Sequence, residues 1–299
     1  MLPTSTTAAP TAAPATPSPT GLRFIWLEVT GRCNLRCHHC YADSGPDGTH
    51  GLMNTTDWLR VIGQAAVLGT EAVQFIGGEP TLHPDLPEFI RHALGEGLAV
   101  EVYSNLVAVS ERLWAVFRQP GVSLATSWYS DDPAEHQQIT GGSPRAHQRT
   151  LANIGLARAY GIPVRVGMVS FGGGQRVEPG LRQLARLGIT HTKVDHVRSV
   201  GRGGNSGEPG IAALCGRCAD GRLAVLPDGN AYLCVFSRWP ERRAGSVLTQ
   251  SLEEIATSPT TAAIRRELQA EFSKRPRREC DPDDGCDPAH CGPDCDPGP

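Results

Sequence analysis

The sequence predicts an α/β fold in which six parallel strands form a partial barrel, followed by a smaller cysteine-rich domain. Between Leu22 and Val200, short apolar runs rich in β-branched residues alternate with helical patterns. Such strand–helix–strand repeats build parallel sheets, because parallel strands need a long crossover. A glycine-rich break then precedes most of the cysteines. Six strands are too few for a closed eight-stranded barrel, and a flat doubly wound sheet is the competing architecture.

The expected strands are short and bounded by turn-forming residues. In chain order they are Phe24–Val29, Ala72–Ile76, Ala99–Tyr103, Val122–Ser127, Val164–Val169 and His191–Val197.

Helical patterns fill the intervals between these strands. Thr55 or Thr56 is expected to cap a helix that ends near Gly69, and Ser110 to cap another. The remaining helices are expected at Leu86–Glu96, around Leu151, Ile154 and Ala157, and around Leu181, Leu184 and Leu187.

The glycine-rich segment Gly201–Gly210 is a natural domain boundary. We therefore expect a tail at residues 1–20, a core domain at 21–205 and a second domain at 206–299. In the second domain, Leu223–Leu226 and Ala231–Val235 flank an Asp-Gly turn, which predicts a hairpin. A helix is expected at Leu252–Leu268.

Composition narrows the class of protein. The chain has 299 residues and a net charge of −3, which gives no sign of a nucleic-acid or membrane partner. No apolar run approaches the roughly 20 residues of a membrane-spanning helix. The Thr/Ala/Pro-rich start lacks a secretory signal, so we expect a disordered tail and a cytoplasmic protein. Ten cysteines in that reducing compartment favour metal binding or catalysis over disulfides.

Three cysteines follow directly on the first strand, with the spacing Cys33-x3-Cys37-x2-Cys40. Thiolates so close together on a loop can converge on one metal centre. A [4Fe–4S] cluster held by three cysteines leaves one iron open to another ligand. The alternative is zinc, which would need a fourth ligand such as His38 or His39. The spacing favours iron–sulfur and leaves both open.

The segment Thr30–Tyr41 resembles the cluster-binding loop of the radical SAM superfamily, apart from His39, where an aromatic or apolar residue is more usual. The resemblance implies a partial (β/α)6 barrel and a [4Fe–4S] cluster that coordinates S-adenosylmethionine. A second match, Gly77-Gly78-Glu79-Pro80, follows the second strand. In the family this strip holds the amino group of the methionine moiety. Alone, it would be an ordinary surface turn.

Polar residues at the ends of later strands complete the expected cofactor site. In the family, residues similar to Ser104 and Asn105 contact the ribose or carboxylate of the cofactor, although a helix-capping loop is an equally good reading. Ser127, at the end of the fourth strand, is expected to face the cofactor too. Parallel strands gather ligands at their carboxyl ends.

The remaining cysteines lie in the second domain, whose tail has almost no aliphatic residues and so needs ligands to fold. Cys218, Gly229 and Cys234 resemble the opening of the SPASM extension of radical SAM enzymes, whereas the ending departs from that pattern. The resemblance implies one or two auxiliary [4Fe–4S] clusters; zinc is the alternative. Two clusters with four protein ligands each would need eight ligands, and only seven cysteines are available. His290 is therefore a further candidate ligand. The expected ligands are Cys215, Cys218, Cys234, Cys280, Cys286, Cys291 and Cys295.

The resemblance implies reductive cleavage of S-adenosylmethionine to a 5′-deoxyadenosyl radical that abstracts a substrate hydrogen. SPASM-type relatives often modify ribosomally synthesised peptides, which is the expected substrate class. Only about twenty residues precede the barrel, so we expect a separate peptide-recognition protein, together with an electron donor such as a flavodoxin or ferredoxin. A small-molecule dehydrogenase or epimerase is the alternative enzyme. A non-catalytic iron–sulfur electron carrier is a third possibility, but the Gly77–Pro80 strip argues against it, because a carrier needs no methionine-binding site.

The segment after the fourth strand has two possible interpretations. Ser130–His136 follows the fourth strand, and its acids and histidine either face the substrate or, as the more common case, form a solvated loop. The sequence identifies no catalytic acid or base.

Overall fold

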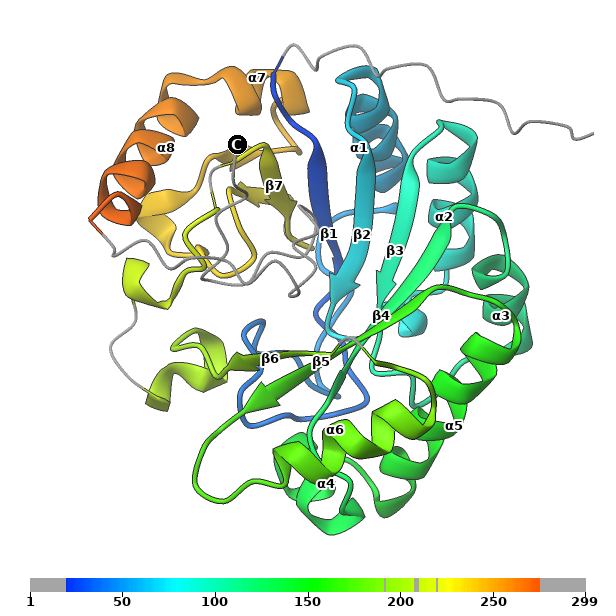
Figure 1. Cartoon of the computed structure of the whole chain (residues 1–299). Coiled ribbons are helices and arrows are strands. Elements are labelled where there is room, and N and C mark those ends of the chain that lie inside the picture. The colour runs from blue at the N-terminus through cyan, green and yellow to red at the C-terminus, as the bar shows by residue number, and fades with distance from the viewer. Residues whose placement is uncertain (1–19, 191, 207–209, 219, 275–299) are drawn as a thin grey trace, which may run out of the picture.

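The computed structural model describes residues 20–190, 192–206, 210–218 and 220–274. Within these residues the strands form one nine-stranded sheet in the order β6-β5-β4-β3-β2-β1-β7-β8-β9 (Figure 1). The strands are β1 (Phe24–Thr30), β2 (Ala72–Gly77), β3 (Ala99–Tyr103), β4 (Val122–Trp128), β5 (Val164–Ser170), β6 (Lys193–His196), β7 (Arg222–Val225), β8 (Asn230–Tyr232) and β9 (Gly245–Ser246).

The strand order decides between the two expected architectures. Strands β1 to β6 are parallel and lie side by side in chain order. A doubly wound sheet would reverse its order at an internal switch point. With right-handed crossovers, an unreversed order places the connecting helices on one face, which bends the sheet into a barrel wall. The sheet ends at β6 and β9 without closing on itself, so the predicted partial barrel is confirmed.

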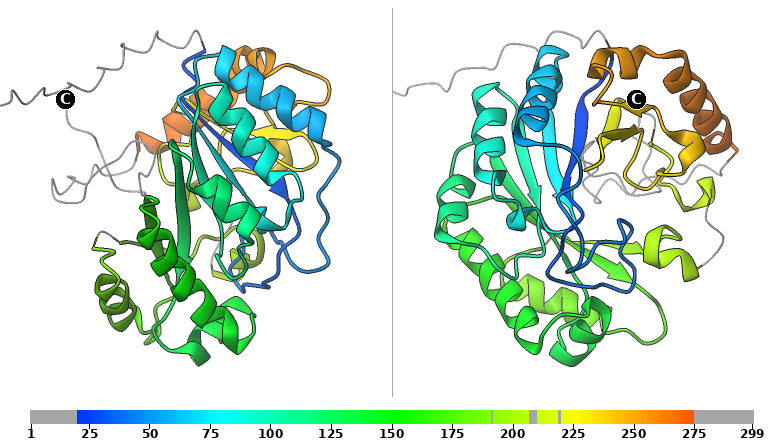
Figure 2. Two further views of the ribbon diagram at one scale, coloured as in Figure 1. Left: turned by 90° about the vertical axis from the view of Figure 1, so that its right-hand side faces the viewer. Right: turned by 180° about the vertical axis from the view of Figure 1, so that it is seen from behind.

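Helices cover the outer side of this curved sheet, and α7 and α8 lie beside β7–β9 (Figures 1 and 2). The α-helices are α1 (Thr55–Val67), α2 (Leu86–Gly95), α3 (Glu111–Phe117), α4 (Pro133–Thr140), α5 (Pro144–Ala159), α6 (Val177–Arg186), α7 (Leu252–Thr257) and α8 (Pro259–Phe272). Short 3₁₀ segments are η1 (Pro80–Leu82), η2 (Gly201–Ser206), η3 (Ile211–Ala213) and η4 (Pro240–Arg242).

The hydrophobic core lies between the sheet and the outer helices. In β1, Ile25, Leu27 and Val29 are fully buried in this core. Because successive side chains of a strand point to opposite faces, Glu28 between them lies on the inner face. The same alternation places Glu101 of β3 opposite the core residues Val100 and Val102. The barrel therefore has an apolar outer layer and an inner face that carries polar side chains.

Several expected boundaries shift for local reasons. Helix α1 is capped by Asn54, not by Thr55 or Thr56, and Asp57 completes a reciprocal capping box. The helix expected at Leu252–Leu268 is two helices, α7 and α8, because Ser258 adopts extended backbone and caps the second one. An extended residue before a proline is the usual geometry. Strand β6 is shorter than expected at both ends.

The solvated-loop reading of Ser130–His136 is wrong from Pro133 onward, where helix α4 begins. Asp132 caps α4 by accepting a hydrogen bond from the Ala134 N–H at 2.9 Å, with a proline at the first helical position. His136 lies on this helix and is 3% exposed.

The sheet continues across the expected domain boundary. Strand β7 pairs in parallel with β1, so the C-terminal segment extends the barrel wall. The hairpin around Asp228-Gly229 is confirmed, because β7 and β8 pair antiparallel and Gly229 has φ 82°. The division at 205/206 stays a prediction, and both residues 1–19 and the cysteine-rich tail from residue 275 lie outside the described residues.

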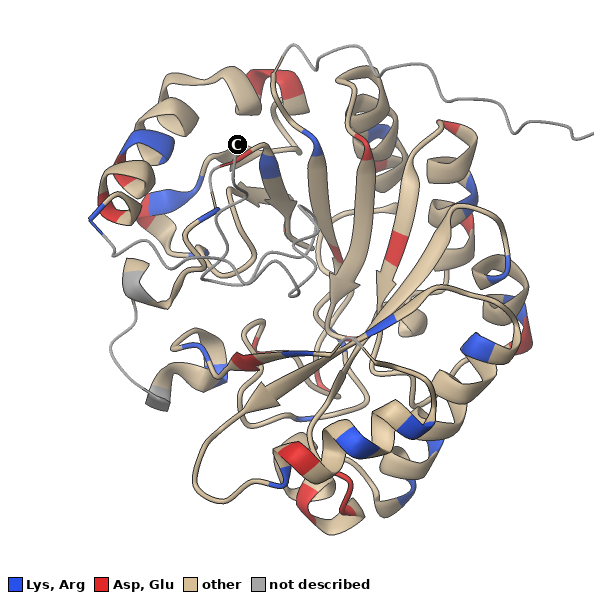
Figure 3. Ribbon diagram, viewed as in Figure 1, with Lys and Arg blue, Asp and Glu red and all other residues tan. Residues whose placement is uncertain are grey.

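Charged residues lie mainly on the outer helices and loops, with both signs interspersed, and few lie on the strands (Figure 3). None of the helices described by the structure combines the length and apolar character needed to cross a membrane.

Candidate functional site

The loop after β1 carries Cys33, Cys37 and Cys40 and lies where the arrowheads of the parallel strands point (Figure 1). Backbone hydrogen bonds hold its turns: the Cys33 N–H donates to Gly45 O at 2.9 Å, and the Cys40 N–H donates to Cys37 O at 3.3 Å. Cys33 is buried, and the other two thiols are half-buried. The loop thus presents three free thiols at the carboxyl ends of the strands.

The surroundings of these thiols suit a metal centre. Backbone N–H groups of Leu35 and Ser44 donate to the sulfurs of Cys33 and Cys40, each at 3.4 Å. Burial, with repulsion from neighbouring anionic groups, raises the pKa of Cys33 and of Cys37 to about 12. Buried thiolates need a positive partner, which a metal cluster provides. The donor set therefore fits the iron–sulfur centre that the sequence predicted.

The zinc alternative needed a fourth ligand, for which His38 and His39 were candidates. His39 instead packs its ring edge-on against Tyr129 and Phe171, and its Nε2 lies 3.2 Å from the Tyr129 hydroxyl. Across the described ranges, no three His, Cys, Asp or Glu side chains converge as one bound metal ion would require. Burial lowers the pKa of His39 to about 4, so the ring is neutral at neutral pH.

Two glycines allow the cysteine loop to pack against the end of β2. A Cβ at Gly77 would lie 2.4 Å from Thr30 O, and one at Gly78 would lie 2.3 Å from Arg32 O. Gly77 also has φ 128°, which favours glycine. In this close approach the Gly78 N–H donates to Thr30 O at 2.7 Å. The strip therefore joins the loop to β2, whatever it binds.

The structure brings Glu79 and Ser104 into contact with each other. The Glu79 carboxylate is 1% exposed. Its Oε1 accepts hydrogen bonds from the Ser104 hydroxyl and from the N–H and hydroxyl of Thr81, at 2.7–3.0 Å. Its Oε2 accepts the Asn105 N–H at 2.7 Å. Burial raises the pKa of Glu79, against these hydrogen bonds. Four protein donors therefore occupy a carboxylate expected to serve mainly the cofactor.

Asn105 links β3 to the cysteine loop. Its Nδ2 donates to Asn34 Oδ1 at 2.7 Å and approaches the Cys33 sulfur at 3.8 Å. Ser127, by contrast, hydrogen bonds the Tyr103 hydroxyl at 2.8 Å. The structure thus brings Glu79, Ser104 and Asn105 next to the thiols and places Ser127 one strand further along.

Sequence reasoning missed the aromatic residues Tyr103 and Tyr129. The Tyr103 hydroxyl pairs with Ser127, and the Tyr129 hydroxyl lies 3.2 Å from Nε2 of His39 in the cysteine loop. Strand-end position was the available signal, because Tyr103 ends β3 and Tyr129 follows β4.

The inner face of the barrel also holds charged pairs that the sequence did not predict. Arg165 of β5 donates two hydrogen bonds to the Glu101 carboxylate, at 2.8 and 2.9 Å, and its guanidinium lies 5.4 Å from the Tyr103 ring centroid. In β1, the buried Glu28 accepts a hydrogen bond from Arg238, which follows β8. These pairs keep polar groups inside the barrel.

The second cysteine group is partly described. Cys215 and Cys218 have their sulfurs 3.7 Å apart, and both Cys218 and Cys234 are buried. The hydrogen bond from the Cys218 thiol lowers the pKa of Cys215. Cys218 also interacts with Cys234, so these three predicted ligands are neighbours. The other four, Cys280, Cys286, Cys291 and Cys295, lie outside the described residues, as does His290.

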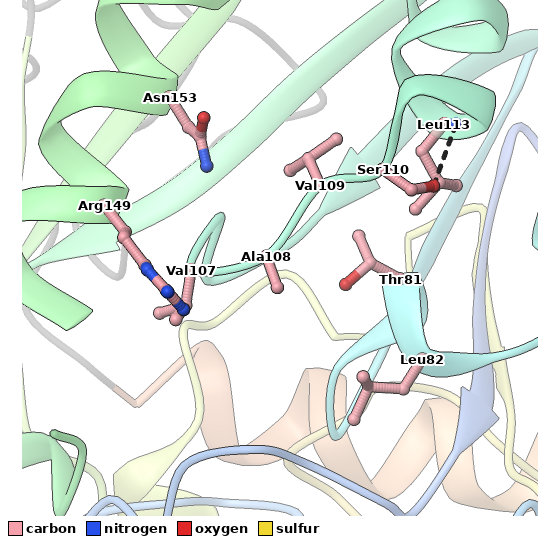
Figure 4. Close-up of a pocket in the computed structure, with 9 residues that line it drawn as sticks. All are labelled: Thr81, Leu82, Val107, Ala108, Val109, Ser110, Leu113, Arg149 and Asn153. Atoms are coloured by element: carbon pink, nitrogen blue, oxygen red, sulfur yellow. Dashed lines mark hydrogen bonds between the residues drawn. The ribbon is translucent and has the colours of Figure 1, made fainter. Parts of the chain in front are cut away.

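An open hollow lies among residues that follow β2 and β3 and residues of α3 and α5 (Figure 4). It contains none of the predicted ligands or cofactor residues. Asn153 of α5 donates to Leu106 O at 2.7 Å beside it, and Ser110 caps α3 at its rim. Its lining residues are Thr81, Leu82, Val107, Ala108, Val109, Ser110, Leu113, Arg149 and Asn153.

The chain belongs to the radical SAM superfamily, whose model matches residues 27–180. An iron–sulfur cluster-binding domain model of the SPASM type matches residues 215–287. Both matches confirm the family predicted from the cysteine loop and the C-terminal cysteines. Membership implies a [4Fe–4S] cluster with S-adenosylmethionine in the first part and auxiliary iron–sulfur clusters in the second.

Among curated proteins, the chain is similar to PqqA peptide cyclases. It is 27% identical to that of Granulibacter bethesdensis over 180 residues, or 60% of this chain and 48% of the relative. It is 32% identical to that of Methylorubrum extorquens (strain PA1) over 203 residues, or 64% of this chain and 51% of the relative. The chain thus matches about half the length of these relatives.

Solved structures share the fold. Streptococcus suis SuiB bound to S-adenosylmethionine aligns with a TM-score of 0.67 at 14% identity, over 82% of this chain and 68% of SuiB. The structure of anSMEcpe with bound AdoMet aligns with a TM-score of 0.66 at 12% identity, over 83% of each chain.

Proposed function

We propose that this protein is a radical SAM enzyme that modifies a ribosomally synthesised peptide. The observation that carries the proposal is the packing of the three-thiol loop against the Gly77-Gly78 strip, at the carboxyl ends of the parallel strands. When bound, the cluster and S-adenosylmethionine supply a 5′-deoxyadenosyl radical for hydrogen abstraction. The chain's own groups bind, orient and shield the reactants.

Within this proposal each predicted residue has a defined place. Cys33, Cys37 and Cys40 hold the first cluster. The Gly77–Glu79 strip faces the amino group of the cofactor through backbone carbonyls, while Glu79 holds the strip to β3. Asn105 orients the cysteine loop through its hydrogen bond to Asn34, and we propose that it also contacts the cofactor.

Ser127 was expected to face the cofactor. Because its hydroxyl pairs with Tyr103 on the inner face, we propose that it faces the substrate side of the barrel instead. The Glu101–Arg165 ion pair lies on the same face. A substrate inside the barrel would therefore meet polar groups that are held in place and whose charges neutralise each other. Positioning by such fixed groups lowers the entropic part of the barrier.

A peptide is the proposed substrate because the relatives are named PqqA peptide cyclases, and SuiB has been solved with its precursor peptide SuiA. An extended peptide can insert one residue while its remote part binds elsewhere and contributes binding energy. The proposal includes an electron donor such as a flavodoxin or ferredoxin and a separate peptide-recognition protein. Cys215, Cys218 and Cys234, with the C-terminal cysteines, are proposed to hold one or two auxiliary clusters.

The test uses anaerobically reconstituted full-length protein. Replacing Cys33, Cys37 and Cys40 together by alanine should abolish 5′-deoxyadenosine formation, measured by chromatography, because the first cluster has lost its ligands. The same variant should retain iron and sulfide at the auxiliary site. Undiminished 5′-deoxyadenosine formation contradicts the proposal.

The substrate class is tested separately. Candidate precursor peptides, with and without a recognition protein, should show a mass change that depends on S-adenosylmethionine. Turnover of sugars or free amino acids alone, with peptides unmodified, would favour a small-molecule dehydrogenase or epimerase.

A further inference from the structure

The segment that follows β6 contacts both cysteine groups. Arg198–Arg202, called here the bridging segment, comes shortly after Lys193–His196 and runs into the 3₁₀ turn that starts at Gly201. Nothing in its sequence resembles a ligand motif, because it holds neither cysteine nor histidine. Its importance comes from contacts with residues far away along the chain.

At its C-terminal end the segment holds the first cysteine loop. The Arg202 N–H donates to Cys40 O at 3.0 Å. Its guanidinium donates to Cys37 O at 2.8 Å, to Ser44 O at 2.7 Å and to the Asp43 carboxylate at 2.7 Å. One arginine thus crosses the loop and fixes carbonyls of two predicted cluster ligands. Several directed bonds to rigid backbone define the position of a loop better than one ion pair does.

The neighbouring Gly201 makes this contact possible. Its φ is 59°, and a Cβ there would lie 2.4 Å from Cys40 O and 2.5 Å from Tyr41 O. Backbone atoms cannot move aside as the end of a flexible side chain can. Any larger residue at this position would therefore displace the segment from the cysteine loop.

At its N-terminal end the segment contacts the second cysteine group. The Arg198 guanidinium donates to Ala213 O at 2.8 Å and lies 4.8 Å from the Phe236 ring centroid. Each of these residues is two positions from a cysteine, Cys215 or Cys234. The side chain is 12% exposed, and its Nε–H is buried without a hydrogen-bond partner among the described residues. Its guanidinium also donates to the Asp195 carboxylate at 2.7 Å.

We propose that Arg198–Arg202 is a positioning element that sets the placement of the two cysteine groups relative to each other. Arg202 and Gly201 fix the loop of Cys37 and Cys40. Arg198 fixes the residues next to Cys215 and Cys234. Because electron transfer between two clusters depends on their separation and orientation, this segment would control how the two sites act together. The metal-bound part of this inference rests on the proposed function, whereas the contacts themselves do not.

The first experiment needs no metal. In the metal-free full-length chain, thiol alkylation is followed cysteine by cysteine by mass spectrometry under anaerobic conditions. Gly201→Ala should raise the alkylation rates of Cys37 and Cys40 by about tenfold or more, which corresponds to about 1.4 kcal/mol of lost protection. Gly161→Ala is the matched control, because Gly161 has φ 72° and a Cβ there would meet no atom within 4 Å.

Arginine variants address each end of the segment. Arg202→Ala should expose Cys37 and Cys40, and Arg198→Gln should expose Cys215 and Cys234. Because the segment joins the two groups, each variant should also change the rates at the other group. Arg60→Ala is the control, since Arg60 likewise donates to a distant carbonyl, Val247 O at 2.8 Å. Arg202→Lys serves if the alanine variant does not fold.

A second readout uses the reconstituted protein. Electron paramagnetic resonance of the reduced clusters should show altered magnetic interaction between them in Gly201→Ala but not in Gly161→Ala. If Gly201→Ala matches its control at every thiol, the positioning role is overturned. If the alkylation pattern holds but no iron–sulfur cluster forms, the positioning role stands and the proposed function fails.

Discussion

Single glycines and one carboxylate decide how closely the cysteine loop approaches the sheet. Gly77 and Gly78 permit backbone contacts that a Cβ would block, and Glu79 joins their strip to the end of β3. The sequence signal for these residues came from a cofactor-binding motif. The structure shows that the same residues also hold the site together, so binding and stability are linked here.

Glu79→Ala should destabilise the protein as well as weaken cofactor binding. The change leaves buried donors of Thr81, Ser104 and Asn105 without an acceptor, and each such loss costs roughly 1–3 kcal/mol. We expect the free energy of unfolding of the metal-free protein to fall by about 3 kcal/mol, measured by urea denaturation. Glu71→Ala, at an exposed position, should have little effect. Equal urea midpoints for the two variants would contradict this role.

Buried histidines on the outer side of β4 predict a loss of stability in acid. Burial, followed by repulsion from His147, lowers the pKa of His136 from 6.5 to about 4. The unfolded chain therefore takes up the proton first as the pH falls. The stabilisation is complete above about pH 6.5 and is lost between there and about pH 4, up to about 3 kcal/mol. Neighbouring groups are the Tyr129 ring and, facing His147, Asp131 and Asp132.

The measurement is the urea midpoint as a function of pH. His136→Phe keeps a ring in the packed position and removes the titrating group, so its midpoint should fall less between pH 6.5 and 4 than that of the original chain. An unchanged slope in this variant would assign the acid sensitivity to other groups.

Among the elements, α4 connects the barrel to the cysteine loop. Its last carbonyls, Ile139 O and Thr140 O, accept the N–H groups of His38 and Arg36 at 3.1 and 3.0 Å. The helix ends at Gly141, whose φ of 62° allows the loop to pass close by. Helix α4, which was not expected from the sequence, is therefore one support of the candidate cluster site.

Removing the cap of α4 should affect the cysteine loop specifically. Asp132→Ala deletes the acceptor for Ala134 N–H, and Ser110→Ala deletes the equivalent acceptor of α3. Each should cost about 1 kcal/mol, seen as a small fall in melting temperature. Only Asp132→Ala should also speed the loss of the first cluster's iron to a chelator. Equal rates of iron loss would show that α4 does not support the loop.

Across the whole molecule, the C-terminal segment completes the barrel wall. Strand β7 covers the edge of β1, and Arg238 pairs with the buried Glu28 of that strand. The leucine, alanine and valine of β7 belong to the same hydrophobic core as the outer helices. The two proposed domains therefore share a sheet and a core, although their cysteine groups are distinct.

A chain ending at residue 205 should not fold stably. It would leave β1 as an open edge and Glu28 as a buried charge without its partner, which costs several kcal/mol. Size-exclusion chromatography and circular dichroism should show aggregation or loss of the cooperative transition. A chain ending at residue 274 keeps every described element and should melt cooperatively. Cooperative melting of the shorter chain at the same temperature would establish 21–205 as an independent domain.

The order of the barrel strands, most of the helices, the family and the two cysteine groups could be predicted from the sequence, because they depend on local periodicity and closely spaced motifs. Helix α4 and the division between α7 and α8 could not. The three thiols lie within eight positions of one another, and Gly77–Glu79 directly follows a strand. The individual cofactor and cluster ligands stay predictions.

The partners of these groups became visible only in the folded chain. Arg202 reaches Cys37 over 165 positions, and Arg238 reaches Glu28 over 210. No local pattern encodes such pairs, since they depend on which strands become neighbours and how closely glycines let backbones approach. For the same reason His136 is buried within a segment whose composition resembles a loop. Local sequence patterns specify the helices and strands, whereas tertiary packing specifies which side chains share a site.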